Sequence, residues 1–110
     1  MALDVGTLAN QMLGAALPIL KKDAQDAESF AKTEFTKIAQ TIVSIGEQLT
    51  AGIINEDQAT LLLDMQTSAS RNVLLTLEGL ALLAVEEAIN AALDVVKNTV
   101  NAALGFALLA

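Results

Sequence analysis

The chain contains no cysteine, histidine, tryptophan or tyrosine, and it has a single proline among its 110 residues. Without cysteine no disulfide can form. Without cysteine and histidine, neither a thiolate zinc site nor an imidazole-ligated iron or copper site can be built. Cysteine nucleophiles, and serine nucleophiles that rely on a histidine base, are excluded for the same reason. We therefore expect no catalytic residues, no cofactor and no enzymatic activity.

Positive charge is scarce as well. Six Lys and Arg stand against 13 Asp and Glu, which gives a net charge of −7. Nucleic-acid binding rests on clustered Lys and Arg that neutralise phosphates. The pair Lys21 and Lys22 is too small to form such a patch. We expect no nucleic-acid partner.

Long hydrophobic runs are missing too. The longest charge-free segment, residues 5–20, has 16 residues and includes Thr7, Asn10 and Gln11, whereas a spanning helix needs about 20 largely apolar residues. Asp4 and the lack of a basic residue near the start argue against a secretory signal peptide. We expect no transmembrane span, and the location is left open between the cytoplasm and export without a cleaved signal.

Alanine and leucine are abundant, with 20 and 19 residues. Between residues 20 and 49 the apolar side chains recur at spacings of three and four, which predicts a long amphipathic helix. This series comprises Leu20, Ala24, Ala27, Ala31, Phe35, Ile38, Ile42, Ile45 and Leu49.

A turn is predicted directly after this helix. Gly52 suits the left-handed position that ends a helix, and Ile53 follows where an apolar contact often completes such an end. Asn55 is a good N-cap for the next helix, and Gln58 stands three residues later, as in a capping box. Ile54 precedes the cap, where it can pack against the new helix. The chain is expected to reverse here.

Beyond the turn there is no proline, and Gly79 and Gly105 are isolated, so we expect one helix of about 50 residues. On the other side of the turn, Pro18 predicts a kink in a continuous helix. The predicted fold is all-α, a single-domain antiparallel helical hairpin with arms of about residues 2–51 and 55–110.

The second arm is too apolar for one partner helix. Of the 50 residues from position 61 onward, 31 are apolar, more than the three in seven that a bundle helix needs. An eleven-residue repeat keeps one stripe of side chains facing the same way along a helix. Its members here are Leu62, Val73, Ala84, Val95 and Phe106. We therefore expect the hairpin to pack with other copies into a multi-helix bundle or filament.

The contact surface is expected where the two charge-free ends, residues 5–20 and 98–110, come side by side in the hairpin, with a further stretch near the middle of the second arm. The candidate contact residues are Leu8, Met12, Leu13, Leu17, Leu80, Leu83, Val100, Leu104, Phe106 and Leu108.

A polar stripe interrupts the second arm. It comprises Glu86, Asn90, Asp94, Lys97 and Asn101, with Glu78 and Glu87 close by. One interpretation is a buried polar network or a carboxylate cation site. The favoured interpretation is a solvated face, because charged residues are mostly exposed.

These patterns predict a non-catalytic structural or interaction protein that self-assembles through its apolar helix faces. The expected partner is a second copy, with lipid or another helical protein as further candidates. The alternative function is that of an amphitropic membrane-binding or pore-forming helical protein. The absence of tryptophan and tyrosine weakens this alternative, since those rings favour membrane interfaces.

Overall fold

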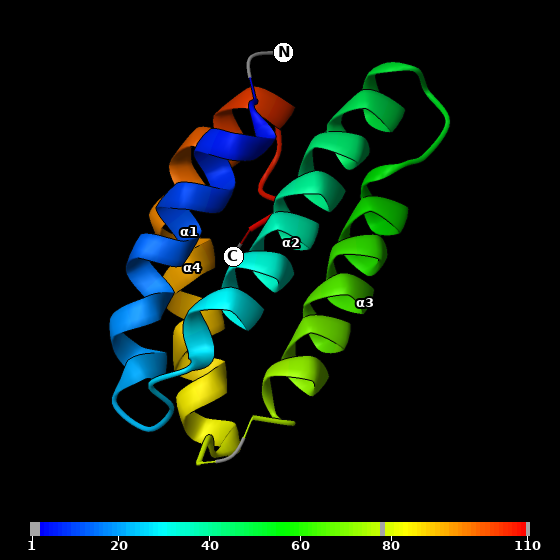
Figure 1. The fold of residues 1–110 in the computed structure, drawn as a ribbon. Coiled ribbons are helices and arrows are strands. Elements are labelled where there is room, and N and C mark those ends of the chain that lie inside the picture. Colours follow the sequence, from blue (N-terminus) through cyan, green and yellow to red (C-terminus); the bar gives the residue numbers. More distant parts are fainter. Residues whose placement is uncertain (1–2, 78, 110) are drawn as a thin grey trace.

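The computed structural model describes residues 3–77 and 79–109, and all regular secondary structure in these ranges is helical (Figure 1). The predicted all-α class is confirmed. The helices are α1 (Val5–Lys21), α2 (Ala27–Thr50), α3 (Glu56–Leu74) and α4 (Leu82–Leu104). Together they form an elongated bundle of 42 × 22 × 20 Å.

The first predicted arm is interrupted, although not at its proline. Helix α1 runs through Pro18 and ends at Lys21, and residues 22–26 connect it to α2. Gly14 and Pro18 are both exposed. Water can therefore reach the Gly14 carbonyl, which proline leaves without its intrahelical donor.

The second predicted arm is interrupted by residues 75–81, and α4 ends at Leu104, so the expectation of one helix over residues 55–110 is wrong. Gly79 lies in this connection with a φ of +93°, and a Cβ atom there would stand 2.5 Å from the Asp23 carbonyl oxygen. The loop between α3 and α4 thus packs against the loop between α1 and α2. The eleven-residue repeat does not follow one helix, because it crosses this connection and its last member, Phe106, lies beyond the end of α4. Ala2, Glu78 and Ala110 lie outside the described residues.

The helices pack unequally. Helix α1 packs against both α4 and α2, and α2 also packs against α3, whereas α3 meets α4 at few positions (Figure 1). The largest fully buried apolar side chains come from α1, α2, α4 and the end of α3. They are Leu8, Met12, Leu20, Phe35, Ile38, Ile42, Ile45, Leu74, Val85, Val96 and Val100.

A tight turn joins α2 to α3. The Gly52 and Ile53 N–H groups donate to the carbonyls of Leu49 and Gln48 at 3.1 and 2.9 Å, and Gly52 has a φ of +73°. The Asn55 side chain accepts from the Gln58 N–H at 2.8 Å, and the Gln58 side chain accepts from the Asn55 N–H at 2.9 Å, which completes a capping box.

The two isoleucines of this turn differ in burial. Ile54 is half-buried and packs against the hydrophobic core. Ile53 is exposed, so the apolar contact expected of it is not buried. The hydrogen bonds of the helix end and the capping box therefore fix the turn without that contact.

Candidate functional site: the grooves beside helix α3

Four of the sequence-predicted contact residues are covered by the chain itself. Leu8, Met12, Val100 and Leu108 are buried in the hydrophobic core. Helices α1 and α4, which carry the first three, pack directly against each other. In the single chain these four side chains therefore do not form an open surface, because other parts of the same chain cover them.

The other predicted contact residues are more accessible. Leu13, Leu80, Leu104 and Phe106 are half-buried against the core, and Leu17 is half-buried. Leu83 is 69% exposed. The large apolar side chains that α3 and α4 expose to a comparable degree are Leu61 (59%), Met65 (60%), Leu82 (50%) and Val95 (51%). Among the described residues, the exposed apolar surface thus lies mainly on α3 and α4.

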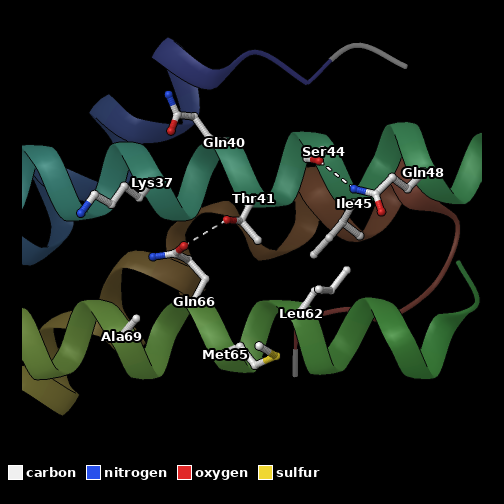
Figure 2. A pocket seen from close by; sticks show the side chains of 10 residues that line it. All are labelled: Lys37, Gln40, Thr41, Ser44, Ile45, Gln48, Leu62, Met65, Gln66 and Ala69. Carbon is white, nitrogen blue, oxygen red and sulfur yellow. Dashed lines mark hydrogen bonds between the residues drawn. The ribbon is translucent and has the colours of Figure 1, made fainter.

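One groove follows the line between α2 and α3 and has a volume of about 570 Å³ (Figure 2). Its α2 wall is mostly polar and its α3 wall mostly apolar. The lining residues are Lys37, Gln40, Thr41, Ser44, Ile45, Gln48, Leu62, Met65, Gln66 and Ala69.

A hydrogen-bonded chain crosses this groove. The Thr41 hydroxyl donates to the Gln66 side-chain oxygen at 3.4 Å, and the Gln66 amide donates to the buried Ser70 hydroxyl at 3.1 Å. The bond from Gln66 satisfies the Ser70 hydroxyl in the interior, where an unpaired polar group would be unfavourable. Their role is to tie α3 to α2.

A second groove separates α3 from α4. It has two adjoining sections of about 580 and 350 Å³, which share Asp64, Asn90 and Leu93. The larger section is also lined by Thr60, Leu63, Ala91, Asp94, Leu108 and Leu109. The smaller is also lined by Thr67, Arg71, Glu86 and Ile89. Leucine side chains and polar groups alternate around it, an arrangement suited to binding.

The C-terminal segment enters this second groove. After Gly105 the chain turns back toward the middle of the bundle (Figure 1), and Leu108 and Leu109 become buried. The Asn101 amide donates to the Leu109 carbonyl at 2.9 Å, and its oxygen accepts from the Leu109 N–H at 3.0 Å. The sequence does not predict this non-helical return of the chain, because residues 107–109 are apolar residues that also suit the continuation of a helix.

The polar stripe of α4 is not a buried core network. Asn90 and Asp94 are exposed, while Glu86, Lys97 and Asn101 are half-buried. Glu86, Asn90 and Asp94 line the groove between α3 and α4. In the described part of the chain, no group of three or more acidic side chains is placed to hold a metal ion.

Two further carboxylates have defined partners. Glu34 is buried on α2, and Lys37 Nζ lies 3.2 Å from its Oε2. At the start of α1, the Thr7 backbone N–H and then the Thr7 hydroxyl donate to Asp4, and these bonds lower the pKa of the Asp4 carboxyl. Both pairs are explained by local structure.

Comparison with protein-family models, with curated protein sequences and with solved structures gives no match. Within residues 3–77 and 79–109, no helix is both long enough and apolar enough to cross a membrane. The functional argument therefore rests on the exposed apolar side chains and on the two grooves.

Proposed function

We propose that the protein is a non-catalytic structural or interaction protein that self-assembles through apolar side chains exposed on α3 and α4. The supporting observation is the position of these side chains. Leu61 and Met65 lie in the half of α3 nearest the α2–α3 turn, while Leu82 and Leu83 form the start of α4 at the opposite end of the bundle (Figure 1). We call these the α3 patch and the α4 patch.

Two different patches favour a heterologous contact, in which the α3 patch of one copy meets the α4 patch of the next. Such a contact repeats, and it produces an open filament or a closed ring according to the rotation between copies. Burying one leucine fully is worth about 1.5–3 kcal/mol. Several such side chains together offset part of the entropy that association loses.

The test is the mass of the protein by light scattering in detergent-free buffer. The wild type is expected to exceed the 11.5 kDa of one chain. Leu61→Glu and Leu83→Glu are each expected to give monomers, because each places a charge in one patch. An equimolar mixture of the two variants is expected to form a dimer, since each keeps the patch that the other has lost.

Gln40→Glu adds the same charge at an exposed position of α2 and is expected to keep the wild-type mass. A wild type that stays at the mass of one chain contradicts the proposal. If that monomer sediments with phosphatidylcholine vesicles, membrane binding replaces self-assembly as the proposed function. If the mixture of variants stays monomeric, the two patches do not meet.

A further inference from the structure

The groove between α3 and α4 is the open side of the bundle. Close packing runs from α4 to α1, from α1 to α2 and from α2 to α3, while α3 and α4 meet at few positions. Leu63 and Leu93 contribute apolar surface from its two helices, and Asp64, Asn90 and Asp94 provide polar groups. A groove of this composition offers apolar contact together with hydrogen bonds.

The chain itself shows what this groove accepts. Leu108 and Leu109 are buried and form part of the wall of its larger section. The side chain of Asn101 satisfies both the N–H and the carbonyl of Leu109, at 3.0 and 2.9 Å. A short non-helical segment is thus held by leucine burial and by one amide that pairs with its backbone.

A second asparagine lies on nearly the same face of α4. Asn90 precedes Asn101 by eleven residues, which is about three helical turns, so the two amides lie within about 20° of the same direction and about 17 Å apart. Asn90 is exposed and lines the groove beside Leu93. Its amide is therefore available to pair with the backbone of a second segment as Asn101 pairs with Leu109.

The charges around the groove distinguish between possible occupants. The larger section is lined by the carboxylates of Asp64 and Asp94 and by no Lys or Arg among the described residues, and the smaller section adds one carboxylate, Glu86, and one cation, Arg71. The groove as a whole therefore carries more negative than positive charge. A second copy of this chain carries a net charge of −7, so these carboxylates attract it less than they attract a positively charged segment of another protein. A segment with Lys or Arg beside its leucines is attracted.

We infer that the groove between α3 and α4 binds a short, non-helical, leucine-containing and positively charged segment of a different protein. The Asn90 amide pairs with the backbone of that segment, Leu63 and Leu93 contact its leucines, and Asp64 and Asp94 attract its cations. This binding is separate from the proposed self-assembly, because it uses neither the α3 patch nor the α4 patch.

The experiment measures fluorescence anisotropy of a labelled peptide, Lys-Lys-Ala-Leu-Leu-Ala-Lys-Lys, titrated with the full chain. Asn90→Ala is expected to weaken binding about fivefold to tenfold, through loss of the amide hydrogen bonds. Asp94→Asn and Asp64→Asn are each expected to weaken it about twofold to fivefold. Peptides with Glu in place of Lys, or Ser in place of Leu, are expected not to bind.

Asp26→Asn is the matched control, since it makes the same charge change on an exposed residue that directly precedes α2 and lines neither section of the groove. It is expected to bind the peptide as the wild type does. The variants are compared at equal helicity, measured by circular dichroism. Binding that Asn90→Ala leaves unchanged, or that Asp26→Asn and Asp94→Asn weaken equally, overturns the inference. Because Leu61→Glu removes self-assembly and leaves the groove intact, the same titration with that variant separates the two proposals.

Discussion

Helices α1 and α3 both pack against α2, and they differ in what else holds them. Helix α1 also packs along α4 and buries the large side chains Leu8, Met12 and Leu20. Helix α3 is two residues longer, yet its large buried side chains are Leu63 and Leu74, and grooves run along both of its sides. The grooves thus lie beside the helix with the fewest buried side chains, and elements with little burial have the lowest local stability.

The largest expected effect tests the difference in burial between α1 and α3 with the same substitution, leucine to alanine, in each helix. Leu20→Ala in α1 leaves an enclosed cavity and is expected to lower the free energy of unfolding by about 4 kcal/mol. Leu63→Ala in α3 opens into a groove that water already reaches, so we expect about 2 kcal/mol. Urea unfolding followed by circular dichroism measures both. Equal losses would mean that α3 is held as firmly as α1.

The next effect concerns the two loops that flank α3. Gly79→Ala combines a φ of +93° with a Cβ atom 2.5 Å from the Asp23 carbonyl oxygen, and we expect a loss of about 2–3 kcal/mol in stability. Gly52→Ala meets no atom within 4 Å, so the strain of its left-handed backbone alone predicts about 1 kcal/mol. The same urea measurement applies. A smaller loss at Gly79 than at Gly52 would show that the two loops do not depend on their close contact.

These two glycines also show how far the sequence predicts the fold. The turn at Gly52 is specified by neighbours in sequence, because the helix end, the N-cap Asn55 and its partner Gln58 all lie within seven residues. The loop at Gly79 is specified by Asp23, which is 56 positions away. Leucines surround Gly79 on both sides, so the local pattern is that of a helix. Contacts between distant loops leave no periodic signal.

The candidate site was only partly predictable for the same reason. The polar stripe that contains Asn90 and Asp94 is visible in the sequence. That the stripe faces α3 across a groove depends on the division of the second arm into two helices. The buried apolar residues Leu8, Met12 and Val100 are predicted as contact residues from the sequence, but their partners are in the same chain.

A smaller effect is expected at the start of α3. Asn55→Ala removes the acceptor of the Gln58 N–H bond and is expected to lower the free energy of unfolding by about 1 kcal/mol. The loss matters more for α3 than it would for a well-packed helix, because little burial compensates for it. Asn55→Asp, which keeps an acceptor at this position, is expected to stay close to the wild type. If Asn55→Ala also stays there, packing rather than the cap sets the start of α3.

The smallest expected effect is a pH dependence that the start of α1 shows and the start of α3 does not. Helix α1 begins with the ionisable Asp4, and α3 begins with an amide that does not titrate. The hydrogen bonds from Thr7 lower the pKa of the Asp4 carboxyl below its value in the unfolded chain. The contribution of Asp4 to stability is therefore fully present above the unfolded pKa and is lost as the pH falls through the folded pKa.

The measurement is an NMR titration of the Thr7 and Gln58 amide protons from neutral to strongly acidic pH. The Thr7 signal is expected to move with a midpoint below the usual range of an aspartate, as its acceptor loses charge. In Asp4→Asn the acceptor oxygen remains and nothing titrates at that position, so this transition is expected to vanish while the Gln58 signal behaves as in the wild type. A Thr7 transition that persists in Asp4→Asn would assign the change to a neighbouring carboxylate, and the start of α1 would then respond to acid no more directly than the start of α3.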